Sequence, residues 1–432
     1  MNKTKIEMSD SLPGDRCFST VLDNGLTVRI CPMPTKRGVY ALLGAKIGST
    51  TRDFKLGGRD VRVPAGVAHF LEHKLFESEQ GDAFDLFAKT GASANAYTSF
   101  EQTCYLFSTS INSAQSLKTL INFVGEPHFT DETVAKEQGI IGQEIKMYDD
   151  NADWVLTMMT LGCLYNTHPI RDDIAGTVNS IAEITPQLLY DCYNAFYRPQ
   201  NMALCIAGNV DPDEVLEIAR SEYSKTPACP QTVERMEVCE ANGIKCGSAR
   251  REMRVSMPQF CLGYKHDPST ITNRLERAIA IKLLISVIAS ETSPLYRSLY
   301  DDGLINETFD GSSITGDDFC CSVFCGESSD PEKVAAAIRA EIENTANRGI
   351  NTVRFEECRR SLLGRELCLY DSIENVASRM MDSHFKDYGI YDIIDEIKNI
   401  TAEKSEKVLR EAFDNSRSAI AVINPQREQE QL

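Results

Sequence analysis

The stretch GVAHFLEHKLFES, residues 66–78, holds two histidines four residues apart, His69 and His73, with Glu72 directly before the second. The chain has 6 histidines in 432 residues, so two of them within one helical turn require an explanation. Histidines at positions i and i+4 of a helix lie close enough to bind one metal ion, and a glutamate at i+3 lies beside them. The alternative is an ordinary solvated helix face.

The apolar residues of this stretch repeat with the period of a helix. One side of the helical wheel carries Val67, Phe70, Leu71 and Leu75. Nearly opposite lie His69, Glu72, His73 and Phe76. The spacing predicts a helix that packs on a core with its apolar stripe and holds the three polar side chains toward a cleft.

A tetrahedral catalytic zinc takes a third protein ligand and keeps one position for water. The stretch TDETVAKEQGIIGQEIKMYDDNADW, residues 130–154, predicts a helix whose buried face contains Val134, Ile141, Ile145 and Tyr148. Glu137 and Glu144 fall within that apolar face, two turns apart. A buried, unpaired carboxylate is costly, so both need a cation or strong hydrogen bonds. Zinc would supply the cation; a wider polar face or an ion pair with Lys or Arg is the alternative.

The order HxxEH, then ExxxxxxE about 70 residues later, resembles the inverted zincins, the family of pitrilysin, insulin-degrading enzyme and the mitochondrial processing peptidase β subunit. The resemblance implies that His69, His73 and Glu144 bind one Zn²⁺ per chain. It implies that Glu72 is the general base. Glu137 matches the first glutamate of the second motif and would support the catalytic site.

The resemblance extends over essentially the whole chain. ANAYTSFEQTCYLFS, residues 94–108, is similar to the edge strand of the family, with Asn95, Ala96 and Tyr97 where the substrate backbone binds. Phrases such as SPLYRSLYDDGLINETF are most similar to a bacterial YmfH-like branch. The implied activity is zinc-dependent hydrolysis of short or unfolded peptides that bind extended, as an added β-strand.

One segment departs from the family pattern. Active members usually have an Arg and a Tyr that hold the substrate near the zinc, in a segment like L-R-x-x-x-x-L-G-Y. Here Tyr300 stands at the expected position of the Arg and is a candidate substrate-binding residue, while Asn306 stands roughly at the expected position of the Tyr. Arg297, one turn earlier, is the candidate replacement, and an exposed surface arginine is the alternative. The second hypothesis is therefore a non-catalytic or partner-dependent peptide-binding subunit of a two-chain peptidase complex, in which a homologous chain supplies the missing groups.

The chain alternates strand-like runs with helical patterns and contains an internal repeat. ITPQLLYDCYNAFYRPQNMALCIAGNVDP and ITAEKSEKVLREAFDNSRSAIAVINPQ share a helix that opens at Ile-Thr, an Ala-Phe pair and an apolar strand, with Thr185 and Thr401 at equivalent positions. The pattern predicts an α+β fold with two homologous αβ halves. The resemblance implies the metallopeptidase/LuxS-like type, with the halves facing each other around a cleft or chamber. The expected segments are a zinc-binding half at 1–225, a linker at 226–248 and a metal-free half at 249–432.

Local patterns predict further elements along the chain. STVLDNGLTVRICP indicates a hairpin turning at Asp23–Gly25, and GVYALLGAKIGS a buried strand. The expected helical segments near the N-terminus are 66–77, 81–90, 112–124 and 131–164.

Composition restricts the partners and the compartment. The net charge of −18 disfavours nucleic acid and anionic membranes, and AIAIKLLISVIAS is too short to span a bilayer. The N-terminus has no apolar signal segment. The 15 cysteines include no CxxC pair, which fits a reducing cytoplasm. Cys320, Cys321 and Cys325 are expected to pack as small apolar residues in a strand rather than bind a metal.

Overall fold

The computed structural model describes residues 4–12, 14, 16–78, 81–223, 232–267 and 273–426. The chain forms two compact units, each with its own sheet. The first unit combines Met1–Ile145, Asp173–Glu237 and Arg365–Ile394. The second combines Lys146–Asp172, Val238–Gly364 and Asp395–Leu432. Each half of the sequence therefore contributes a segment to the unit that is built mainly from the other half.

A seven-stranded sheet forms the first unit, in the order β1-β2-β3-β11-β4-β10-β9. Its strands are β1 (Lys5–Glu7), β2 (Cys17–Val21), β3 (Thr27–Pro32), β4 (Val39–Ala45), β9 (Ser93–Thr98), β10 (Thr103–Thr109) and β11 (Met202–Gly208). Strands β2 and β3 form the predicted hairpin, and β4 is the predicted buried strand. All pairs are antiparallel except β11 with β3. Strand β9 lies at one edge of the sheet.

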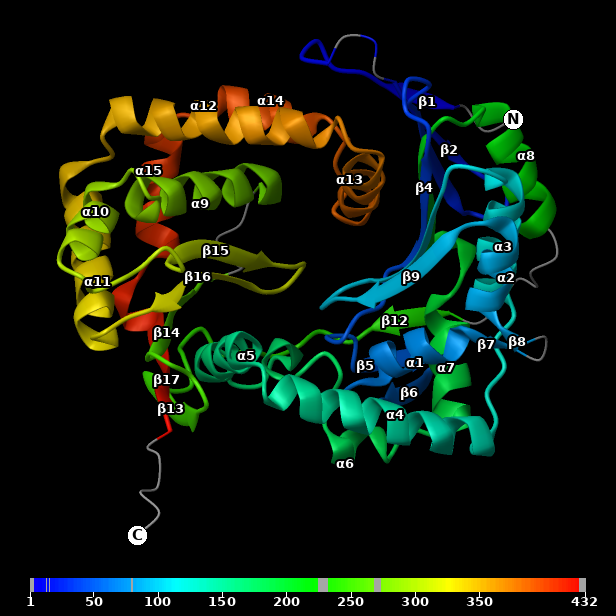
Figure 1. Ribbon diagram of the computed structural model, residues 1–432, viewed down its shortest axis with the longest axis horizontal. Helices are drawn as coiled ribbons and strands as arrows, with labels where there is room; N and C mark the ends of the chain where they lie inside the picture. The colour runs from blue at the N-terminus through cyan, green and yellow to red at the C-terminus, as the bar shows by residue number, and fades with distance from the viewer. Residues whose placement is uncertain are drawn as a thin grey trace. The chain divides into compact units, whose positions relative to one another are not determined.

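Helices cover both faces of this sheet. One face packs against α1 (Val67–Leu75), α2 (Ala83–Thr90), α3 (Ser113–Gly125) and α8 (Pro212–Tyr223), while α7 (Pro186–Phe196) contacts α1. The other face packs against α13 (Ile373–Phe385), drawn in orange in Figure 1, which comes from the C-terminal part of the chain.

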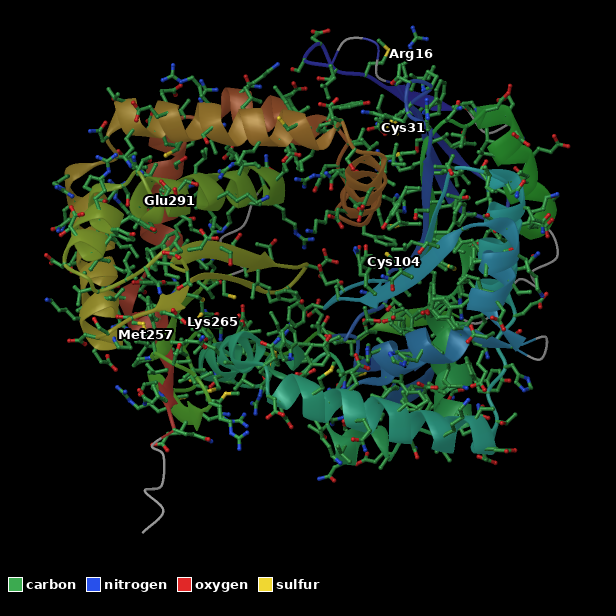
Figure 2. The ribbon with its side chains drawn as sticks, in the orientation of Figure 1. Arg16, Cys31, Cys104, Met257, Lys265 and Glu291 are labelled. Atoms are coloured by element: carbon green, nitrogen blue, oxygen red, sulfur yellow. The ribbon has the colours of Figure 1, made fainter. Side chains whose placement is uncertain are left out.

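Specific contacts hold α13 on the sheet. The guanidinium of Arg29 on β3 is buried, and it donates to the carbonyl oxygen of Met380 at 2.7 Å and to Oγ of Ser383 at 2.6 Å. Gly44 makes room for the helix, since a Cβ at that position would lie 2.7 Å from Sδ of Met381 and 2.9 Å from Sγ of Cys104, which Figure 2 labels. A buried guanidinium needs such partners, so the first unit depends on this distant segment.

Smaller elements complete the first unit. A three-stranded sheet has the order β12-β5-β6, with β5 (Asp53–Leu56), β6 (Arg59–Arg62) and β12 (Val233–Arg235). Part of the expected linker, residues 226–231, lies outside the described residues, but its residues 233–235 form β12 and pair with β5. The remaining elements here are β7 (Glu77–Ser78), β8 (Gly81–Asp82), α6 (Val178–Ile181) and η2 (Pro199–Asn201).

The prediction of a single helical segment at 131–164 is wrong in one respect. It forms two helices, α4 (Asp131–Asp149) and α5 (Ala152–Leu164). Asn151 ends the continuity because its backbone is extended and its side chain accepts a hydrogen bond from the backbone N–H of Trp154, which caps α5.

A five-stranded sheet forms the second unit, in the order β13-β17-β14-β16-β15. Its strands are β13 (Ser248–Met253), β14 (Gln259–Lys265), β15 (Asp310–Thr315), β16 (Cys320–Glu327) and β17 (Ser418–Pro425). Helix α5 packs on β13, β14 and β17, while α9 (Arg274–Ala289) packs on β15 and α11 (Pro331–Arg348) on β14. The other elements are η1 (Pro169–Arg171), α10 (Pro294–Asp301), α12 (Thr352–Leu369), α14 (Asp392–Asn399), α15 (Ala402–Ala412) and η4 (Asn415–Arg417).

The two sheets confirm the predicted internal repeat. The series β3-β11-β4-β10-β9 and β13-β17-β14-β16-β15 have the same pairing, with one parallel pair followed by three antiparallel pairs. Thr185 and Thr401 are the N-caps of α7 and α15, which precede the equivalent strands β11 and β17. Helices α5 and α13 also precede equivalent elements, and each packs on the sheet of the other sequence half. The fold is α+β with two homologous halves.

Two further expectations concern cysteines and apolar helices. Cys320, Cys321 and Cys325 lie on β16, and the 14 cysteines of the described residues are all free. Among those residues, Arg274–Asp301 is the one helical run with the length and hydropathy of a membrane span, and 56% of its apolar 18-residue window is buried in the fold. Because α9 itself has 16 residues and a span needs about 20, this run has the properties of a core helix.

Candidate metal centre

Helix α1 carries the HxxEH stretch, as predicted. The apolar stripe is confirmed, since Val67, Phe70, Leu71 and Leu75 are buried. The helix starts at Gly66, which has a φ of 91° and where a Cβ would lie 2.4 Å from the carbonyl oxygen of Ala175. Only glycine fits both conditions, so this residue sets where the helix starts and therefore which side chains it directs toward the sheet.

Helix α4 carries both glutamates of the second motif. Val134, Ile141 and Ile145 are buried, and Glu137 is only 7% exposed among them. The prediction that Tyr148 is buried is wrong, because its side chain is 38% exposed. The last turn of α4, from residue 146, is exposed throughout, so the apolar periodicity continues beyond the part of the helix that the core covers.

The two helices bring His69, His73 and Glu144 together. Nε2 of His69 lies 3.7 Å from Oε1 of Glu144, and Nε2 of His73 lies 3.5 Å from Oε2 of the same carboxylate. Ligands of a tetrahedral zinc lie about 3.3 Å apart, given metal–ligand distances of about 2.05 Å. One ligand atom from each residue falls within 4.8 Å of the others. Two imidazoles and one carboxylate at these distances fit a zinc ion with one position left open.

Glu137 orients one of these imidazoles. Its Oε1 lies 3.0 Å from Nδ1 of His73. An ionised carboxylate only accepts hydrogen bonds, so Nδ1 carries the proton and Nε2 keeps its lone pair toward the cluster. A carboxylate behind a histidine ligand is the usual arrangement in zinc sites, where it sets the tautomer and raises the basicity of the ligand.

Burial and nearby charges shift the pKa values of His69 and His73 in opposite directions. Burial, with a smaller contribution from His73, lowers the pKa of His69 to about 3, so its imidazole is neutral at physiological pH. Burial also works against protonation of His73, but the hydrogen bond with Glu137 and the nearby carboxylates outweigh it and raise the pKa of His73. Metal ligands must be deprotonated, so a cation at this site would compete with a proton on His73 far more than on His69.

The carboxylates of the site are also perturbed. Burial raises the pKa of Glu72, against the lowering effect of the hydrogen bond from Thr98. Burial likewise raises the pKa of Glu144. Glu72 is 8% exposed, and its Oε2 accepts a hydrogen bond from the Thr98 hydroxyl at 2.6 Å. A carboxylate with a raised pKa beside a candidate metal site is suited to accept and release a proton during a reaction.

The candidate substrate residues Asn95, Ala96 and Tyr97 lie on the edge strand β9, as expected. The backbone N–H of Ala96 donates to Oδ1 of Asn95 at 2.8 Å rather than to β10. Because antiparallel strands alternate between inward and outward pairs, the polar groups of Ala94, Ala96 and Thr98 face the free edge. This edge of the described sheet has no partner strand, so it can accept an extended peptide.

The other two candidate substrate residues, Arg297 and Tyr300, lie on α10 in the second unit. Arg297 is exposed, and Tyr300 is 49% exposed with its ring stacked on Tyr296 at a centroid distance of 5.9 Å. Asn306 is held within its own unit, where Nδ2 donates to Oε2 of Glu327 at 2.7 Å.

Sequence reasoning missed several residues around the centre. Lys74 on α1 is completely buried and forms an ion pair with Glu77, which also faces Lys136 of α4 at 3.5 Å. The spacing of Lys74 from Phe70 and Leu71 places it in the apolar stripe, and this was the available signal. Thr98 gave no signal, since its hydroxyl reaches Glu72 only in the folded sheet.

Comparison with known proteins places this site in a family context. Residues 59–178 match the family described as Insulinase (Peptidase family M16), and residues 183–362 match the family described as Peptidase M16 inactive domain. The chain is 38% identical to the "Uncharacterized zinc protease YmfH" of Bacillus subtilis, over 94% of this chain and 95% of that one. It is 23% identical to the "Uncharacterized zinc protease YmxG" of the same organism, over 93% and 97%.

Solved structures agree with this result. An M16-like peptidase from Alicyclobacillus acidocaldarius has a TM-score of 0.92 and 32% identity, covering 97% of this chain and 100% of that one. Pitrilysin shares the fold, with a TM-score of 0.80 and 18% identity, over 98% of this chain and 46% of pitrilysin.

Proposed function

The chain belongs to peptidase family M16, and on this premise we propose that it is a zinc-dependent endopeptidase acting on short or unfolded peptides. The observation that carries the proposal is the convergence of His69, His73 and Glu144 at distances suited to zinc. Zinc bound there would activate a water molecule and polarise the scissile carbonyl group.

Glu72 would be the general base. Its Oε2 is engaged by Thr98, which leaves Oε1 to accept the proton of the attacking water and pass it to the leaving amine. Glu137 would keep Nδ1 of His73 protonated, so that Nε2 stays available as a ligand. The peptide would pair with the outward polar groups of Ala96, after the Asn95 side chain moves away from the Ala96 N–H.

Two variants of the purified chain test this proposal. Glu72→Gln should keep one zinc per chain but lose chelator-sensitive cleavage of a mixed peptide library, read by mass spectrometry, because an amide cannot take the proton. Glu144→Gln should lose zinc itself. Full activity in both variants would refute the assignment of the site.

A second candidate is a peptide-binding subunit that needs a homologous partner chain. The feature in its favour comes from the family resemblance, in which Tyr300 and Asn306 stand near the positions where active members usually have Arg and Tyr. Zinc-loaded wild-type protein that cleaves nothing alone, but forms a larger particle and cleaves with a co-expressed homologue, would support it. Cleavage by the isolated chain would exclude it.

We propose that the protein acts in the cytoplasm, with no membrane or nucleic acid partner. Free thiols support a reducing compartment, and the net charge of −18 supports the choice of partners. Fractionation with chelator-sensitive peptidase activity as the marker tests the compartment.

A further inference from the structure

The backbone and the side chains of the edge strand β9 have different roles at the candidate metal centre. Its outward backbone groups face the free edge, while the side chain of Thr98 points to α1 and donates to Oε2 of Glu72 at 2.6 Å. No other hydrogen bond to the Glu72 carboxylate is present among the described residues. One hydroxyl therefore determines which way this nearly buried carboxylate turns.

Thr98 is itself held by a rigid hairpin. It pairs with Thr103 across the β9–β10 register, and the Thr103 hydroxyl donates to the carbonyl oxygen of Ile47 at 2.9 Å. Ser99 closes the turn, since its N–H donates to the carbonyl oxygen of Gln102 at 2.8 Å. Gly48 lies against the turn, where a Cβ would come within 2.4 Å of its backbone. The position of the Thr98 hydroxyl is thus determined by the hairpin rather than by its own rotamer alone.

A distant segment supports the opposite face of the same hairpin. Nε2 of Gln102 donates to Oδ1 of Asp382 on α13 at 3.1 Å and to the hydroxyl of Tyr97 at 3.3 Å. Asp382 belongs to the C-terminal part of the sequence but to the first unit of the fold. The hairpin is therefore secured on one face by α13, while on its other face it presents Thr98 to Glu72.

We propose that Thr98 is a positioning residue that orients Glu72 for proton transfer, so that one strand both receives the peptide and aims the base. The proposal rests on the function proposed above. The hydrogen bond from the Thr98 hydroxyl occupies Oε2 of Glu72. It leaves Oε1 as the oxygen that faces the attacking water. Without it, a carboxylate with no other hydrogen-bonding partner would sample several rotamers, and proton transfer depends steeply on geometry.

The test compares three variants with the wild type. Thr98→Val keeps the shape but removes the donor, and Thr98→Ser restores a donor. Thr109→Val is the matched control, because it removes a hydroxyl from the far end of β10, where Oγ1 donates to the carbonyl oxygen of Ile111 at 2.6 Å and does not touch Glu72. We expect kcat to fall about 10-fold or more in Thr98→Val with KM within about twofold, and to recover in Thr98→Ser. Zinc content should equal that of the wild type in all three.

Crystal structures of zinc-loaded wild type and Thr98→Val provide the readout that does not depend on activity. The Glu72 carboxylate should occupy one conformer in the wild type and a different or divided position in the variant. An unmoved Glu72 in Thr98→Val, or an equal loss of kcat in Thr109→Val, overturns the proposal. An inactive wild type whose Glu72 still moves in Thr98→Val refutes the proposed peptidase function but not the positioning role.

Discussion

Glu137 and His73 form a hydrogen bond of 3.0 Å that joins α4 to α1 behind the candidate zinc position. The same two helices meet again at Glu144, whose carboxylate faces both histidines. The ligand geometry therefore depends on the packing of one helix against the other, and Glu137 contributes to it without facing the metal.

Replacing Glu137 tests this supporting role. Glu137→Gln removes the charge that keeps Nδ1 of His73 protonated, so zinc affinity should fall about 10-fold to 100-fold. Competition with a chromogenic chelator measures it. Glu132→Gln, at an exposed position in the first turn of α4, is the control and should bind zinc like the wild type. Equal affinities in the two variants would show that Glu137 has no such role.

The free edge of β9 predicts that a proline at position 96 weakens peptide binding without disturbing the sheet. Ala96→Pro removes an N–H that faces away from β10, so the β10 ladder is preserved while one bond to the peptide is lost. KM should rise several-fold with zinc content unchanged. A peptide N-methylated at the residue paired with Ala96 should show the same weakening with the wild-type protein. If KM stays the same in both experiments, the peptide does not bind as an added strand.

Lys74 and Glu77 predict a non-additive effect on stability. Glu77→Gln leaves the buried ammonium of Lys74 without its counterion and should lower the free energy of unfolding by about 3 kcal/mol or more. Lys74→Met should cost far less, because it removes the charge and conserves the volume. In the double variant Lys74→Met/Glu77→Gln, stability should return close to that of Lys74→Met. Urea unfolding of the four proteins measures the coupling, and simple additivity would contradict it.

Buried His266 predicts a dependence of stability on pH in the second unit. Burial, helped by Arg277 and Arg417, lowers the pKa of His266 to about 3, while that of an unfolded histidine is about 6.5. Between these values only the unfolded chain takes up the proton, so stability falls as the pH falls from 6.5 toward 3. The loss attributable to His266 between pH 7 and pH 5 is about 2 kcal/mol.

Urea unfolding of metal-free wild type and His266→Asn at these two pH values checks this contribution. Nδ1 of His266 lies 3.0 Å from Sγ of Cys320, and Nε2 lies 3.1 Å from Oγ of Ser322, so the substitution itself lowers stability. The decisive quantity is therefore the difference between the two pH values within each protein. An identical difference in wild type and variant would contradict the prediction.

Much of the candidate site could be predicted from the sequence because it depends on helix periodicity. Spacings of four and seven residues place His69 with His73, and Glu137 with Glu144, on one helix face each. These spacings do not show that the two helices lie against each other. The prediction that His69, His73 and Glu144 form one site came from the family resemblance. The same periodicity misplaced Tyr148, because it does not indicate where the covering core ends.

Contacts between distant segments account for what the sequence did not reveal. The pattern of α13 predicts an amphipathic helix but does not identify the sheet it covers, and its bonds to Arg29 span 351 and 354 residues. The hydrogen bond between Thr98 and Glu72 likewise requires the completed sheet. Lys74 is different, because its place in the apolar stripe was visible, and only its partner Glu77 had to be found in the structure.

The reciprocal placement of α5 and α13 has a consequence for the origin of the fold. A single ancestral half would have left one face of its sheet bare, and two copies could each have covered the other by exchanging equivalent helices. On this view gene fusion converted an exchanged homodimer into one chain. Two fragments separated between residues 237 and 238 should then be poorly soluble alone but reassemble on co-expression, because each carries the helix that completes the core of the other.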